Sequence, residues 1–374
     1  MEERVRRQAR AMLPIIASGC LSSAAHGAVT LYGVADANIE YVNHLSPVLP
    51  TQTGFPGDGK TRVGLTSGGL AGSRWGIRGT EDLGGGLGAV FALESGFDLD
   101  AGSATQGGRL FGRQAFVGLT STSAGRLTFG RQYTAAFDAF SNFSPSRYST
   151  QYEPIAVLLG LDFRSDNTVK YTTTMGGVTA IVNGSFGNGV AGGGEVPGSF
   201  RRDTGFGAAL NYFSGDLGLA AAFDRFNPTL NTTGATGNFR KAGVAASYRV
   251  GPAKLMGGAR WGLNEAANGS TIVRDNYYWA GVNYSATPAL ELTLAYYYDD
   301  VKMLNRSNVD NPWQVSVIAD YNLSKRTDLY VTAAYVRHAG INFDTSAVSF
   351  ANGYYLGRGY DSMLTIAAGI RHRF

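Results

Sequence analysis

The sequence predicts an all-β protein whose strands close into an antiparallel transmembrane barrel, and three observations support this class. Glycine supplies 52 of the 374 residues, only 16% are charged, and the mean hydropathy is -0.08, so the chain is poor in charge without being uniformly apolar. Short segments of alternating apolar and polar residues recur from Val29 onward. No segment has the ~18 uninterrupted apolar residues of a membrane helix, which leaves a closed barrel to satisfy the backbone in lipid.

The first 27 residues have the composition of a cleaved secretory signal peptide. Four arginines precede an apolar run from Ala11 to Leu21, and Ala25-His26-Gly27 is a small-x-small cleavage site. The apolar run favours this interpretation over a nucleic-acid or membrane-surface role for the arginines, so we expect no nucleic-acid partner. Cleavage after Gly27 leaves 28–374 as the barrel domain; it removes four of 32 basic and two of 28 acidic residues, for a mature balance of +2.

The single cysteine, Cys20, lies inside this leader, so the mature chain can form no internal disulfide. Ala17-Ser18-Gly19-Cys20 also weakly resembles a lipoprotein processing site, in which the cysteine becomes the first mature residue. The small-x-small site downstream favours the ordinary signal peptide.

About sixteen strands are expected. Five precede residue 133, beginning with a long strand at Val29 and including Ser73–Thr80, Arg109–Thr120 and Arg126–Gln132, and eleven follow from Thr168. The period of two sends Leu292 and Leu294 to one face and Glu291 and Thr293 to the other. Brief turns alternate with long polar connections, and an even strand number with this asymmetry is typical of outer-membrane barrels.

The stretch 133–166 interrupts the alternation. It carries acids at Asp138, Glu153 and Asp162 and an apolar run, Ile155–Leu159, that is unusual for an exposed loop. Unstructured loops of this length inside compact domains are uncommon and usually functional. We therefore expect a long third external loop folded into the lumen, with its apolar run anchored on the inner wall.

Arginines surround this loop in the sequence. Arg74 and Arg78 lie on the polar face of their strand, opposite Trp75 and Ile77. The parity of Arg113 leaves its orientation open, because only a bulge or a rim position would turn it inward. The full set of candidate wall residues is Arg74, Arg78, Arg113, Arg131 and Arg164. If the loop acids face these arginines, the transverse field would filter hydrated ions and small polar solutes.

The sequence contains few residue patterns typical of catalysis or cofactor binding. Gly84–Ala89 fits a loose dinucleotide fingerprint, but a strand follows it where a phosphate site needs a helix N-terminus. The mature histidines, His44, His338 and His372, are scattered without metal-ligand spacing, so no metal or cofactor is expected. We predict no enzyme activity. A serine–histidine or acid–histidine pair could still form in space, so a lipase- or protease-type outer-membrane barrel is the alternative, and a plugged structural or adhesive barrel is a third.

Several motifs resemble the Gram-negative general diffusion porins of the betaproteobacterial and neisserial type, and the resemblance spans the mature chain. They are Val29-Thr30-Leu31-Tyr32-Gly33, Ser73–Gly84, Leu93-Glu94-Ser95-Gly96-Phe97, Arg113–Leu119, Asn167-Thr168-Val169-Lys170-Tyr171, Leu323–Thr327 and Gly369–Phe374. One departure is the loop, which lacks the Pro-Glu-Phe-Gly-Gly type of motif common there.

The resemblance implies a sixteen-stranded barrel that forms a homotrimer in the outer membrane, among lipid and lipopolysaccharide. It implies a constricting third loop, passive diffusion of ions and small hydrophilic solutes, and a mild anion preference. The matching motif positions for the pore arginines are Arg74, Arg113 and Arg164. Phe374 would be the C-terminal signal read by the barrel-assembly machinery.

Overall fold

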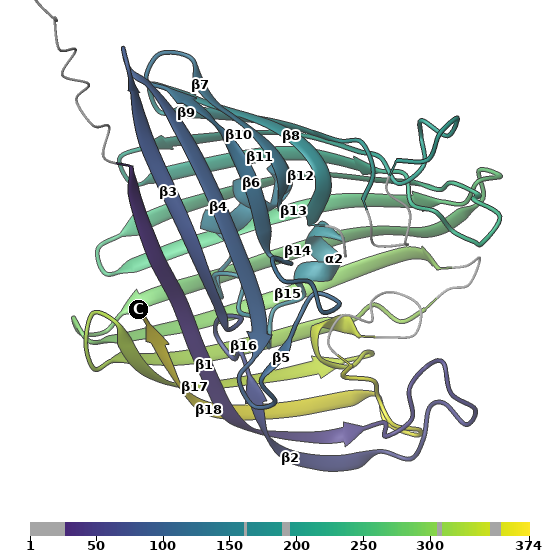
Figure 1. The fold of residues 1–374 in the computed structure, drawn as a ribbon. Coiled ribbons are helices and arrows are strands. Elements are labelled where there is room, and N and C mark those ends of the chain that lie inside the picture. The colour runs from purple at the N-terminus through teal and green to yellow at the C-terminus, as the bar shows by residue number, and fades with distance from the viewer. Residues whose placement is uncertain (1–26, 161–162, 189–194, 305–308, 345–352) are drawn as a thin grey trace, which may run out of the picture.

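The computed structural model describes residues 27–160, 163–188, 195–304, 309–344 and 353–374 (Figure 1). The predicted signal peptide, apart from Gly27, and the loop acid Asp162 lie outside the described residues. Within these ranges the chain is almost entirely strand, with short helical turns on the segment between β7 and β8 and one near residue 342.

The first half of the chain contains β1 (Ala28–Leu45), β2 (Lys60–Ser67), β3 (Arg74–Gly84), β4 (Leu87–Asp98), β5 (Ser103–Ala104), β6 (Gln114–Ser121), β7 (Gly125–Tyr133), α1 (Ala135–Phe140), the 3-10 turn η1 (Ser141–Phe143), α2 (Ile155–Leu159), β8 (Arg164–Met175) and β9 (Val178–Ser185). The second half contains β10 (Gly205–Ser214), β11 (Leu217–Phe226), β12 (Asn238–Val250), β13 (Ala253–Glu265), β14 (Thr271–Ser285), β15 (Leu290–Leu304), β16 (Trp313–Asn322), β17 (Thr327–Arg337), the 3-10 turn η3 (Ile341–Phe343) and β18 (Ser362–Arg373).

These strands form one closed antiparallel barrel. Over the described residues the sheet has eighteen segments, but β5 is a two-residue arm paired with the end of β4, and β2 and β3 both pair with β1 as two halves of one strand. Leaving out β5 and counting β2 and β3 as one strand gives sixteen barrel strands. The ring closes where β1 pairs with β18, from Val34 opposite Arg373 to Val42 opposite Thr365. The predicted fold class is confirmed.

Side-chain alternation follows the predicted period of two. On β15, Leu292 and Leu294 are 40% and 51% exposed on the outer surface, whereas Ala295 and Tyr297 are fully buried on the inner side. An outward apolar face of this kind suits contact with lipid hydrocarbon, and the inner face carries the polar residues. None of the helices in the described part of the chain has the length and hydropathy of a membrane span.

Connections differ between the two rims. Two-residue turns join β8 to β9, β10 to β11 and β12 to β13, and the glycines in the last two, Gly215 and Gly251, have φ of 55° and 54°, where a side chain would be strained. The opposite rim carries longer connections, including those after β1, β9 and β17 (Figure 1). The predicted asymmetry is therefore present.

Two strand boundaries differ from the sequence-based expectation. The strand expected from Arg109 begins at Gln114, because Gly107 and Gly108 adopt φ of 73° and 77° and turn the chain. The strand expected at Ser73 extends back to Lys60 but is interrupted at residues 68–73.

That interruption is held by a buried carboxylate on the neighbouring strand. The Asp36 carboxylate accepts hydrogen bonds from the backbone N–H groups of Gly69, Leu70 and Ala71 at 3.0, 3.0 and 2.8 Å. It also accepts a hydrogen bond from the hydroxyl of Tyr330 at 2.6 Å. Because the bend is fixed by a side chain from another strand, local sequence does not reveal it.

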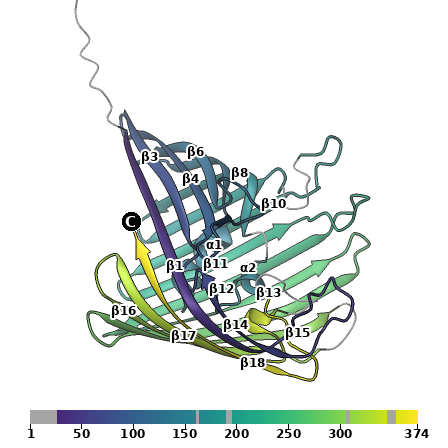
Figure 2. The same ribbon diagram turned by 60° about the horizontal axis from the view of Figure 1, so that its bottom comes forward.

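The main hydrophobic core lies inside the ring rather than between layers. It joins the segment after β7 to inward side chains of strands on the far wall. In Figure 2, α1 and α2 lie within the ring of strands. The interior is thus divided between a packed region and open space.

Candidate functional site

The segment 134–163, between β7 and β8, begins by packing on the adjacent wall. Thr134 caps α1 by accepting a hydrogen bond from the N–H of Phe137, and the N–H of Ala135 donates to Asn183 Oδ1 at 2.8 Å. The inward positions of β10 and β11 facing this helix include Ala209 and Ala220, which belong to the same apolar cluster. Their small side chains leave room for a helix against the inner wall.

The segment then reaches the opposite strands. The indole N–H of Trp279, on β14, donates to the carbonyl of Phe143 at 2.8 Å, and Asn283 Nδ2 donates to that of Pro145 at 2.8 Å. One strand further on, the hydroxyls of Ser146 and Tyr297 lie 2.7 Å apart. A segment rooted between β7 and β8 that bonds to β14 and β15 crosses the lumen.

Its tip contacts β1 and the bend at residues 68–73. Ser149 Oγ donates to the carbonyl of Gly69 at 2.9 Å, and the hydroxyl of Tyr152 donates to Glu40 Oε1 at 2.8 Å. Gln314, on β16, donates to the carbonyl of Tyr152 at 3.1 Å. The loop is therefore tied to three separate parts of the wall.

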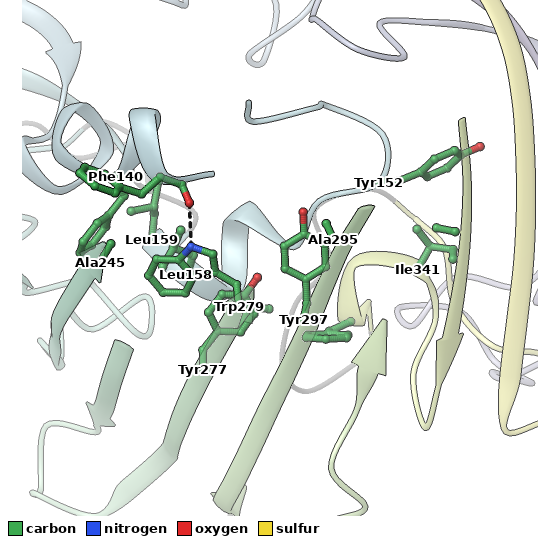
Figure 3. Close-up of a cluster of buried hydrophobic side chains, with 14 of the residues drawn as sticks. Phe140, Tyr152, Leu158, Leu159, Ala245, Tyr277, Trp279, Ala295, Tyr297 and Ile341 are labelled. Atoms are coloured by element: carbon green, nitrogen blue, oxygen red, sulfur yellow. Dashed lines mark hydrogen bonds between the residues drawn. The ribbon is translucent and has the colours of Figure 1, made fainter. Parts of the chain in front are cut away.

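The apolar run Ile155–Leu159 forms α2 on the return path. Leu158 and Leu159 are buried, and Figure 3 shows them gathered with Phe140 and Trp279. The guanidinium of Arg260, on β13, donates to the carbonyl of Val157. These contacts match the anchoring expected from the sequence, and the helix itself was not expected there.

Three arginines meet at the base of this loop, and we call Arg74, Arg113 and Arg164 the arginine triad. Arg113 Nε donates to Glu94 Oε1 at 2.7 Å, and Arg74 Nε lies 3.6 Å from Glu94 Oε2. The hydroxyl of Tyr133 accepts from both Arg113 and Arg164, at 3.0 and 3.2 Å. One carboxylate and one neutral hydroxyl therefore hold three positive charges together.

Arg164 is the least compensated member. Its Nε is buried and has no hydrogen-bond partner, and no carboxylate of the described residues is in ion-pair contact with it. Its guanidinium lies over the rings of Tyr133 and Phe163, 4.8 and 4.7 Å from their centroids, which favours the charge weakly through the ring quadrupole.

The other predicted wall residues lie near the triad. Arg131 donates to Asp166 Oδ1 at 2.6 Å, and Arg109 donates to the same carboxylate at 2.8 Å. Arg78 is exposed, with its guanidinium 4.9 Å from the ring centroid of Tyr32. The position of Arg113, left open by its parity, follows from its place just before β6, where it turns to Glu94.

The loop acids have other direct partners. Asp138 accepts from Lys170 Nζ, on β8, at 2.7 Å. Glu153 is buried and accepts from Ser144 Oγ at 2.6 Å, within the loop itself. Among the described residues, the carboxylates in direct contact with the five predicted wall arginines are thus Glu94 and Asp166.

Burial raises the pKa of Glu153 to about 7 against its ordinary value of 4.5, and the bonds from Ser144 and from backbone N–H groups offset only part of this effect. Tyr277 and Tyr297 face this carboxyl from β14 and β15, and Tyr148 from the loop. A carboxyl in this setting is partly protonated near neutral pH.

A cavity of about 590 Å³ lies between the loop and the wall. The triad, Tyr133 and Glu153 line it, together with the bend at residues 68–73. Of the predicted site residues, Arg74, Arg113, Arg164 and Glu153 line this cavity, whereas Arg78, Arg131 and Asp138 do not.

Sequence reasoning did not single out Glu94, Asp166, Lys170 or Tyr133 as site residues. Glu94 could have been found, because it lies on the polar face of its strand, and the register places it opposite Gly76, between Arg74 and Arg78. Tyr133 offered no such signal, since its role depends on contacts with Arg113 and Arg164, which lie far apart in the sequence.

The three mature histidines lie in different places in the described part of the chain. His44 stacks on Tyr360, His372 contacts Thr327, and His338 Nδ1 lies 3.7 Å from exposed Asp310, beyond hydrogen-bond distance. Among the described residues no cluster of three histidine, cysteine or acidic side chains has the arrangement to hold a metal.

Comparison with known proteins agrees with this geometry. A model of the Gram-negative porin family matches residues 11–341. The chain is 30% identical to an outer membrane porin protein of Bordetella pertussis, over 94% of this chain and 95% of that protein, and 29% identical to outer membrane porin protein 32 of Delftia acidovorans, over 97% and 98%.

Solved structures are similar as well. An anion-selective porin from Comamonas acidovorans has a TM-score of 0.77 and 25% identity, over 93% of this chain and all of that one. OmpT of Vibrio cholerae has a TM-score of 0.65 at 16% identity, covers 95% and 99%, and shows the shared fold. The chain belongs to the Gram-negative porin family and forms an outer-membrane channel for passive diffusion of ions and small hydrophilic solutes.

Proposed function

We propose that this channel prefers anions and that the arginine triad sets the preference at the narrow part of the lumen. The observation that carries the proposal is the charge count at the base of the loop. Glu94 pairs with Arg113 and lies near Arg74, and no carboxylate of the described residues contacts Arg164, so the triad carries two more positive charges than its paired acid. Rings and clusters of charge in a narrow pore set the sign of the permeant ion.

The wider constriction contains the rest of the predicted site. Arg78 and Arg131 extend the positive wall, whereas Asp138 and Glu153 are acids on the loop side; Asp162, the third predicted loop acid, lies outside the described residues. Lys170 neutralises Asp138, and the raised pKa of Glu153 reduces its charge near neutral pH. The preference is therefore expected to be anionic and mild. The Comamonas acidovorans porin, 25% identical, is described as anion-selective, which supports this sign.

We also propose the assembly and targeting of the chain. It acts as a homotrimer among outer-membrane lipid and lipopolysaccharide, without catalytic activity, after removal of residues 1–27. Phe374 is proposed as the signal for the barrel-assembly machinery. Its backbone exchanges hydrogen bonds with Gly33 of β1 at 3.0 and 3.1 Å, so the residue ends the seam where the barrel closes.

The decisive experiment is ion selectivity in a planar lipid bilayer. Purified protein in a tenfold KCl gradient is expected to give a reversal potential of the sign that marks chloride as the more permeant ion. An open channel with a potassium preference would contradict the proposed anion preference. A folded protein without conductance would contradict the channel itself.

A further inference from the structure

We propose that the constriction distinguishes among small anions and preferentially binds those that carry a flat aromatic ring, with single-ring carboxylates as the simplest class. The inference rests on the proposed anion preference and names the kind of anion. It comes from the chemistry of the loop side of the cavity, which the charge count does not use.

The cavity has two chemically different sides. Arg74, Arg113 and Arg164 line one part. The loop contributes apolar and aromatic side chains to the rest, all half-buried rather than enclosed: Phe137, Tyr148, Ile155 and Phe163. Its 590 Å³ lies within the range of about 300–1,000 Å³ that is common for small-molecule sites. A site with an apolar surface beside charged groups suits an amphiphilic anion.

The aromatic side chains form one stacked surface. The ring of Phe137 lies 4.0 Å from that of Tyr133 at an angle of 7°, and 5.4 Å from that of Phe163 at 12°. Tyr148 packs on Phe137 at 4.6 Å. An added planar ring gains contact area and a favourable quadrupole interaction on such a surface, whereas an inorganic anion gains neither.

The aromatic surface and the positive charges share a residue. The hydroxyl of Tyr133 bonds to Arg113 and Arg164, and its ring begins the stack. Arg164 also lies 4.7 Å from the centroid of Phe163, and its Nε has no partner. A carboxylate bound to Arg164 therefore places its substituent within one ring spacing of Phe163, where a flat ring can also stack on the guanidinium plane.

The same site disfavours an aromatic cation. Glu94 is already bonded to Arg113 and to the hydroxyl of Tyr32, so it offers little to a second cation. Asp98 and Glu153 also line the cavity, but four arginines line the same space, namely Arg74, Arg113, Arg147 and Arg164. Charge and apolar surface together favour aromatic anions.

Block of the chloride current through bilayer-reconstituted protein tests the inference. Benzoate is added to the KCl solution and compared with three other compounds. Acetate lacks the ring, cyclohexanecarboxylate has a ring that is not aromatic, and benzylammonium has the aromatic ring but a positive charge. We expect benzoate to reduce the current at a concentration about three- to tenfold lower than the concentration of cyclohexanecarboxylate that has the same effect, which is the range that one aromatic contact supplies. The concentration of acetate needed for the same effect should be higher than that of either ring compound. Benzylammonium is expected to have the weakest effect.

A variant that removes the aromatic ring of Phe163 tests whether benzoate binds at this cavity. Phe163→Leu keeps an apolar side chain and the three arginines, so we expect it to lose most of the difference between benzoate and cyclohexanecarboxylate. Ile155→Ser, which changes a second lining residue, is the substitute if Phe163→Leu does not fold, and it is expected to weaken block by both ring carboxylates. Phe200→Leu is the matched control, because Phe200 is 92% exposed and outside the cavity.

The outcomes separate this inference from the proposed function. Equal block by benzoate and acetate in a channel with normal anion preference would overturn the aromatic site and leave the anion preference standing. A cation preference in KCl would overturn both. Benzoate block that persists unchanged in both Phe163→Leu and Ile155→Ser would also overturn the site.

Discussion

Glu94 sets how much of the positive charge at the loop base is available to a permeating ion. It binds Arg113 directly and lies near Arg74, while the contacts of Arg164 with described residues are the Tyr133 hydroxyl and two ring faces. Removing Glu94 or Arg164 therefore changes the same sum of charges in opposite directions.

We predict opposite shifts in selectivity from two isosteric changes. Arg164→Gln should lower the chloride preference, because it removes the arginine that no carboxylate of the described residues contacts, whereas Glu94→Gln should raise it. Reversal potentials in a KCl gradient measure both. Arg326→Gln, in an exposed turn at the far rim, is the control for loss of one positive charge. Shifts of the same sign in both variants would show that the triad does not act through its charge.

Glu153 couples the packing of the loop to pH. Burial raises its pKa to about 7 from 4.5. A group whose pKa is raised on folding contributes full stability below its unfolded value and loses it as pH rises through the folded value. The contribution of Glu153 to loop packing is therefore fully present at or below about pH 4.5 and is lost as pH rises through about 7.

This sign gives a second prediction. Current fluctuations of the open channel should increase as pH rises from 5 to 8, because the ionised carboxyl loosens the loop. Glu153→Gln, which stays neutral, should make the fluctuations independent of pH over this range. Glu81→Gln, which changes an exposed carboxyl on β3, is the matched control. A pH response in Glu153→Gln as large as in the unmodified protein would assign it to another group.

The inward loop is fixed to the barrel wall at several points. Trp279 contributes both a hydrogen bond to Phe143 and ring contact with Phe140, whose centroid lies 5.7 Å away. Polar bonds define the path of the loop, and the apolar cluster around α2 holds it against the strands.

Trp279→Phe separates these two contributions. The variant keeps an aromatic ring but loses the N–H donor, leaving the buried carbonyl of Phe143 unsatisfied at a cost of about 1–3 kcal/mol. We expect a folded barrel with larger current fluctuations and higher conductance. Trp261→Phe, 37% exposed on the outer surface of β13, should leave the current unchanged. Identical traces from both variants would show that this hydrogen bond does not restrain the loop.

Sequence predicted this element in outline and not in its contacts. The lost alternation marked the loop, and Ile155–Leu159 correctly indicated packing against the wall, because an apolar run of this kind needs burial. The partners come from strands more than one hundred residues away, such as Trp279 and Asn283. No local pattern encodes which inward side chains lie opposite a given loop residue.

For the whole molecule, alternation was the strongest predictor. It correctly placed Arg74 inside and Trp75 outside, and it gave the strand number, because the two faces of a barrel strand meet chemically different surroundings. It failed where a side chain overrides the strand register, as Asp36 does at the bend of residues 68–73. The partner of Arg113 was likewise hidden, since the residue lies just outside a strand.

Ionic strength tests whether the selectivity is electrostatic. The Debye length falls from about 10 Å at 0.1 M salt to about 3 Å at 1 M. The anion preference should therefore decrease between 0.1 and 1 M KCl at a constant gradient ratio, while Arg164→Gln should show a smaller decrease from a lower starting value. A preference that does not change with salt would point to size or specific binding as its origin.

Assembly can be tested on the same protein. If three copies act together, single insertion events in a bilayer should close in three equal steps, and cross-linking in mild detergent should give a species of three times the chain mass. Closure in one step, with a cross-linked product no larger than the monomer, would contradict the proposed homotrimer.

The Tyr133 hydroxyl holds Arg113 and Arg164 close together, and Glu94 is paired with Arg113 alone of these two. An anion beside Arg164 is attracted by a guanidinium that no carboxylate of the described residues contacts, and it is repelled by Glu94 on the Arg113 side. Conduction requires binding that is strong enough for an ion to enter and weak enough for it to leave. A fixed acid beside the arginines limits how tightly the anion is held, so the site can pass ions on rather than retain them.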